Sequence, residues 1–84
     1  MQNEIKYGTS DFPLASYLDY AGFKIVALEQ VDERRKEFIF VGDGIRETVD
    51  AFYAGETLVK PLAYMDSMKK LKSLMYNRGT FNQV

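Results

Sequence analysis

Residues 23–41 read FKIVALEQVDERRKEFIFV. Two runs of large, mostly β-branched or aromatic residues, 23–30 and 36–41, lie on either side of a short polar segment, which is typical of two β-strands. Strands joined by so short a segment pair as an antiparallel hairpin. Phe38 and Phe40 fall on one face of the second strand, and Ile39 and Val41 on the other. We therefore expect both faces of the hairpin to be covered, by helices on one side and by a partner on the other.

The residues before the hairpin predict a helix over about 12–21. Ser10 or Asp11 can cap the first free amides, and Pro13 suits a first helical turn because its missing N–H costs nothing there. Leu14 and Leu18 follow at helical spacing, and Gly22 is a typical helix stop.

Two more helices are predicted after the hairpin, over about 45–54 and 61–77. Gly55 ends the first and Pro61 opens the second. The first helix has an apolar stripe of Ile45, Val49, Phe52 and Tyr53, and the second has one of Tyr64, Met68, Leu71 and Met75. The chain is thus expected to be one α+β domain over 1–84, in the order α-β-β-α-α. Its polar opening is either frayed or a short extra strand through Ile5 and Tyr7.

Composition favours association. The chain has 84 residues, 14% of them aromatic, which is more than a core of this size needs, so a homo-oligomer is expected. Charge is also uneven. Residues 1–59 hold six Lys and Arg against eleven Asp and Glu, a balance of −5, and residues 60–84 hold five against one, a balance of +4. Such asymmetry is typical of a basic binding end or of two halves that attract each other.

The absence of histidine and cysteine excludes most catalytic and metal chemistry. Ser67 and Lys70 match the S-x-x-K spacing of penicillin-binding enzymes without its companion motifs, and chance on a Lys-rich helix explains them. Asp43, Glu47 and Asp50 could approach Mg²⁺, but acids near a helix amino terminus are the plainer interpretation. We expect no enzyme, no metal and no cofactor. The sequence begins with no signal-like segment and has no membrane-length apolar run, so the cytoplasm is the expected location.

Cationic and aromatic residues mark the candidate binding sites. The candidate nucleic-acid contacts, which would grip phosphates, are Lys69, Lys70, Lys72 and Arg78 near the carboxyl end, with Arg34 and Arg35 at the hairpin tip. A solvated charged face is the alternative for both groups. Candidate interface residues are Tyr64, Met65 and Tyr76, because tyrosine and methionine suit adaptable protein interfaces.

Several segments together resemble a family of small domains from bacterial and phage genomes. They are Thr9-Ser10-Asp11-Phe12 leading to Leu14 and Leu18, then Gly22-Phe23, Ile25–Glu29, Phe38–Phe40, Ala51–Tyr53 with Gly55, and Leu71-Lys72 with Leu74 and Tyr76. The likeness covers most of residues 7–76. Members of that family are described as domains of unknown function, so the resemblance implies a phage, prophage or mobile-element context and no mechanism.

Two functions from different classes fit these observations best. The first is a non-catalytic, self-associating protein-interaction module that binds a protein of the same phage or mobile element. The alternative is a small nucleic-acid-binding accessory protein that uses the basic carboxyl-terminal helix.

Overall fold

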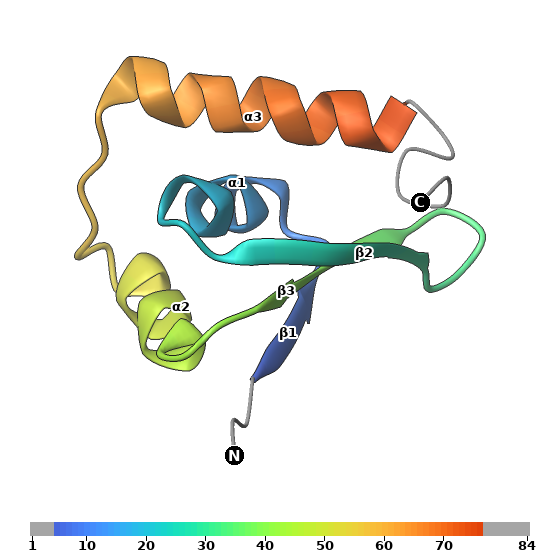
Figure 1. Cartoon of the computed structure of the whole chain (residues 1–84), viewed down its shortest axis with the longest axis horizontal. Helices are drawn as coiled ribbons and strands as arrows, with labels where there is room; N and C mark the ends of the chain where they lie inside the picture. The colour runs from blue at the N-terminus through green and yellow to red at the C-terminus, as the bar shows by residue number, and fades with distance from the viewer. Residues whose placement is uncertain (1–4, 77–84) are drawn as a thin grey trace.

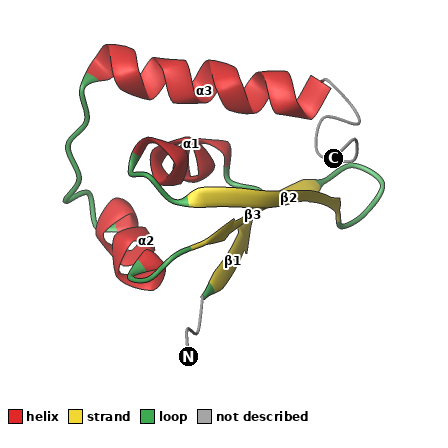
Figure 2. Ribbon diagram, viewed as in Figure 1, coloured by secondary structure: helices red, strands yellow, loops and turns green. Residues whose placement is uncertain are grey.

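The computed structural model describes residues 5–76, which form a small α+β domain of three helices and a three-stranded antiparallel sheet (Figures 1 and 2). Its elements are β1 (Lys6–Thr9), α1 (Phe12–Tyr20), β2 (Lys24–Gln30), β3 (Lys36–Val41), α2 (Ile45–Tyr53) and α3 (Pro61–Tyr76). The α+β class is confirmed, while the predicted order α-β-β-α-α is wrong because a strand precedes α1.

The strand missing from that order is β1, and it completes the sheet. It pairs antiparallel with β3, with Lys6 opposite Val41 and Thr9 opposite Phe38, and β3 becomes the central strand of the order β1-β3-β2. Without β1, one edge of β3 would expose unpaired backbone groups. The strand is only four residues long and includes a glycine, so it has little strand signal of its own.

The hairpin of β2 and β3 forms as predicted, with one irregularity. Ile25 pairs with Phe40 and Ala27 pairs with Ile39, so Val26 is an extra residue, a β-bulge. After the bulge the pairing continues to Gln30 opposite Lys36.

The core lies between the sheet and the helices, which cover one face of the sheet (Figure 1). Phe38 and Phe40 of β3 point into it and meet Leu14 and Leu18 of α1. Helices α2 and α3 add their own buried residues, chiefly Ile45, Val49 and Leu71. Helix α3 forms an outer layer that packs mainly on α1.

The local signals around α1 are confirmed. Asp11 caps the helix, since its Oδ1 accepts a hydrogen bond from the Leu14 N–H at 3.2 Å. Gly22 follows the helix with a φ of 101°, a left-handed conformation that favours glycine.

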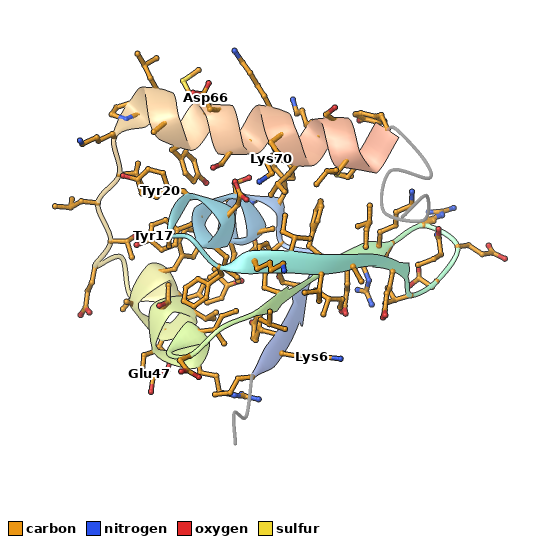
Figure 3. All side chains as sticks on the ribbon, viewed as in Figure 1. Lys6, Tyr17, Tyr20, Glu47, Asp66 and Lys70 are labelled. Carbon is orange, nitrogen blue, oxygen red and sulfur yellow. The ribbon has the colours of Figure 1, made fainter. Side chains whose placement is uncertain are left out.

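The other side of the sheet is here named the open face. The strand register assigns to it Lys6, Gly8, Lys24, Ala27, Glu29, Glu37, Ile39 and Val41, of which Val41 is buried. Figure 3 shows Lys6 pointing away from all three helices. Within the described residues 5–76 the three helices lie on the opposite side, so the expectation that helices cover one face of the hairpin agrees with the structure.

Candidate protein-interaction surface

Large apolar side chains are exposed where α2 ends, where the chain crosses to α3, and where α3 begins. These segments lie along one edge of the molecule (Figure 1). We name this set the apolar edge, and it consists of Tyr53, Leu58, Val59, Leu62 and Met65. Leu58 is 91% exposed and Leu62 77% exposed. Exposed apolar side chains gathered in one region are typical of a binding surface rather than of a solvated one.

The exposure of this edge follows from how α3 docks on α1. Leu71 is fully buried, and Tyr64, Met68 and Met75 are half-buried, so the predicted stripe of α3 faces the domain. Leu62 lies on the opposite, outer side of the same helix, and Met65 lies on its flank beside the stripe. Asp66 also lies on this outer side (Figure 3). Met65, which the sequence analysis names as a candidate interface residue, is 48% exposed.

A chain of aromatic rings in edge-on or tilted contact links the helices next to the apolar edge. It runs from Tyr53 to Phe52, Tyr17, Tyr20 and Tyr64, with ring centroids 5.4, 5.6, 5.9 and 6.3 Å apart in turn. These rings come from all three helices. Each such pair adds about 0.5–1.5 kcal/mol beyond area burial. The helices next to the apolar edge are therefore held to one another.

Tyr53 differs from its prediction, which placed it on the buried stripe of its helix. It is 60% exposed, and its hydroxyl donates a 2.5 Å hydrogen bond to Asp11 Oδ2. The stripe prediction is wrong because Tyr53 is the last residue of α2, where the helix leaves the core. Asp11 thus serves two elements, capping α1 with one oxygen and holding α2 with the other.

This contact changes the acidity of Tyr53. The hydrogen bond to Asp11, together with burial and the negative charge of Asp11, raises the pKa of Tyr53 from 10.0 to about 12. Burial, followed by the charge of Asp11, also raises the pKa of Tyr64. Because the folded-state pKa of Tyr53 is raised, its contribution to stability is complete below about pH 10 and is lost as the pH rises through about 12.

We expect a phenol absorbance titration to find this group. The absorbance difference between wild type and Tyr53→Phe should have its titration midpoint near pH 12. In Asp11→Asn the midpoint for Tyr53 should move down towards pH 10.0, because the hydrogen-bonded carboxylate is removed. Asp50→Asn, at an exposed acid on the same helix as Tyr53, serves as the control and should leave it in place. A Tyr53 midpoint near 10.0 in the wild-type protein would contradict the contact.

Two predicted site residues are engaged in holding α3 to α1. The Tyr64 hydroxyl donates to the Pro13 carbonyl at 2.9 Å, and Lys70 Nζ lies 2.8 Å from Asp19 Oδ1. The Lys60 N–H likewise donates to the Tyr20 hydroxyl at 3.0 Å. Tyr64 and Lys70 therefore have a structural role that their sequence positions did not reveal.

The other predicted cations and aromatic residues are spread over the molecule. Lys69 and Lys72 are exposed on α3, and Tyr76 is 76% exposed at its last position. Arg35 Nε lies 3.9 Å from Asp32 Oδ2 at the hairpin tip, and the Arg34 N–H donates to Asp32 Oδ1 at 2.9 Å. Arg78 lies outside the described residues.

The candidates for other chemistry are not brought together. Ser67 is buried against the domain, whereas Asp43, Glu47 and Asp50 are all exposed. Residues 5–76 hold no group of three or more acidic residues placed to bind a metal ion. A hollow of about 310 Å³ at the hairpin tip is lined by three exposed charged residues of one loop, Asp32, Glu33 and Arg34, and lacks the apolar lining typical of a ligand pocket. Within the described part of the chain, no helix has the length and apolar character needed to span a membrane.

Comparison with known proteins places the chain in a family. A family model described as Domain of unknown function (DUF5659) matches residues 4–77, so the chain belongs to that family. No curated protein and no solved structure matches it.

Proposed function

We propose that this member of the DUF5659 family is a non-catalytic protein-interaction module of a phage or mobile genetic element, and that it associates with itself. The observation that carries the proposal is the exposure of the apolar edge, where five large apolar side chains lie within residues 53–65. Leucine, methionine and tyrosine together can anchor a partner and adapt to its shape.

The setting of the edge supports a binding role. The chain of contacting rings links the helices on either side of the segment that carries Leu58 and Val59, and Tyr53 is held by its hydrogen bond to Asp11. A surface ordered before binding loses less conformational freedom when a partner docks, which favours affinity. The phage or mobile-element context comes from the resemblance in sequence and supports a partner encoded by the same element.

Nucleic-acid binding along the outer side of α3 is the second candidate. Lys69 and Lys72 favour it, because both are exposed and neither is in an ion pair within residues 5–76. Two exposed lysines would contribute little to nucleic-acid affinity, because each phosphate contact releases only about one counterion. The apolar edge is the stronger feature.

Capture from an extract of the source organism tests the proposal. Immobilised wild-type protein and Val31→Asp, which alters an exposed apolar residue at the hairpin tip, should retain the same protein after nuclease treatment. The double variant Leu58→Asp and Leu62→Asp should bind it at least about 30-fold more weakly, because charged groups replace two apolar anchors. Equal capture by all three proteins would contradict the proposal. Material that disappears with nuclease would favour the nucleic-acid alternative.

A further inference from the structure

The open face carries its charges at opposite ends. Lys6 and Lys24 flank Val41 at one end, since both pair with that residue of β3. Glu29 and Glu37 pair with each other near the other end, about 13 Å away along β3. These charges sum to zero, with two lysines against two glutamates.

The arrangement is unfavourable for an isolated chain. Glu29 and Glu37 occupy directly opposite positions on adjacent strands, where like charges destabilise a sheet, and Glu37 leans away from Glu29 over Gly8 of β1. None of the four charged residues forms an ion pair within the described part of the chain. Each end of the face therefore lacks the opposite charge that would neutralise it.

The middle of the face holds one large apolar side chain between two small residues. Ile39 lies at its centre, between Gly8 on β1 and Ala27 on β2. A Cβ added to Gly8 would come within 2.9 Å of Ile39 Cδ1 and 2.7 Å of Glu37 Oε1, so these two side chains lean over the glycine. Ile39 and Glu37 fill the space above Gly8, so at the usual sheet spacing of about 10 Å a second sheet would meet the Ile39 side chain and the Glu37 carboxylate here.

We propose that the open face binds the open face of a second copy of this chain. The two copies are related by a two-fold axis that lies in the plane of the interface, runs perpendicular to the strands and passes near Ile39. Their open faces then stack with the strands of the two copies antiparallel. This arrangement places Lys24 over Glu29 of the second copy and Lys6 near Glu37, and the symmetry repeats both pairs. Ile39 of each copy meets its equivalent. This interface gives the self-association in the proposed function a location, and it rests on that part of the proposal.

Other occupants fit the face less well. It has no aromatic residue among its eight members, so it offers no platform on which bases could stack. Its zero net charge gives no attraction for phosphates. A surface with equal and separated charges is complementary to itself, which is the requirement of a two-fold interface.

The dimer should be weak and sensitive to salt. The face spans about 20 Å by 10 Å, which is smaller than the roughly 800 Å² per partner of a standard interface. Much of its attraction comes from exposed ion pairs, which salt screens. We expect association to increase with protein concentration and to weaken between about 50 mM and 500 mM salt.

Charge reversal tests the pairing by light scattering. Lys24→Glu alone and Glu29→Lys alone should each weaken self-association about 10-fold or more, since two attractive pairs become repulsive. An equimolar mixture of the two variants should restore a dimer, because in the heterodimer both contacts between positions 24 and 29 again join a glutamate to a lysine. Asp50→Lys, an exposed charge on α2, is the matched control and should associate as wild type. Circular dichroism should show that all three variants are folded, because Lys24, Glu29 and Asp50 are exposed.

The outcomes separate this inference from the proposed function. Single variants that associate as well as wild type, or a mixture that stays monomeric, would overturn the sheet-to-sheet pairing while leaving self-association in place. A wild-type protein that remains monomeric at about 1 mM, well above the concentrations at which specific interfaces form, would overturn self-association itself. Neither outcome affects capture of another protein by the apolar edge, which the Leu58 and Leu62 variants test.

Discussion

Phe40→Ala should lower the free energy of unfolding by about 3–5 kcal/mol, whereas Ile39→Ala should lower it by only about 1 kcal/mol. The two residues are neighbours in the central strand and point to opposite faces of the sheet. Phe40 is fully buried beneath the helices, while Ile39 keeps part of its surface in solvent. The total stability of a chain of this length is about 4–12 kcal/mol, so the first variant should lose a large share of it.

Urea denaturation at low protein concentration measures both effects on the monomer. The same Ile39→Ala variant should weaken self-association at high concentration, because Ile39 lies at the centre of the open face. Similar stability losses for the two variants would mean that both faces of β3 are covered within one chain, and would remove the basis for the dimer.

Leu71→Ala should lower the free energy of unfolding by about 2–5 kcal/mol and loosen α3 in particular. Leu71 is the fully buried residue of α3, and that helix packs mainly on α1. Tyr64 and Lys70 also attach α3 to α1 near the surface, by a hydrogen bond and an ion pair, while Leu74 and Met75 pack against the core but are only partly buried. Leu62→Ala, on the outer side of the same helix, should change stability by less than about 0.5 kcal/mol.

Amide hydrogen exchange shows whether the loss is local. In Leu71→Ala, the amides of α3 should exchange much faster while those of α1 and β3 retain more protection. Unchanged exchange in α3, or an equal loss from Leu62→Ala, would contradict the packing of this helix.

The sequence predicted the elements whose signals are local. The hairpin follows from two apolar runs close together, and α1 follows from the cap at Asp11 and the stop at Gly22. For the opening of the chain the sequence allows either a frayed segment or a short strand. It does not decide for β1, because the four residues of β1 gain their stability from β3, about 30 residues later in the chain. Tyr53 was misplaced because its partner, Asp11, is 42 residues away and no local pattern links them.

The charges of the open face depend on a bulge that no local sequence pattern marks. Lys24 and Glu29 are five residues apart, so in a regular strand they would point to opposite faces. The bulge at Val26 shifts the alternation by one residue and brings both to the open face. No glycine or proline marks that bulge in the sequence, so the arrangement of charges could not be predicted from it.

The most direct test of the account is a dilution series followed by amide NMR. As wild-type protein is concentrated from about 20 µM to about 1 mM, the range in which a small interface should fill, signals should shift at Gly8, Ala27, Glu29 and Ile39. The shifts should fade in high salt, and α3 should remain unaffected. Spectra that do not change with concentration, or shifts confined to the helices, would contradict self-association through the open face.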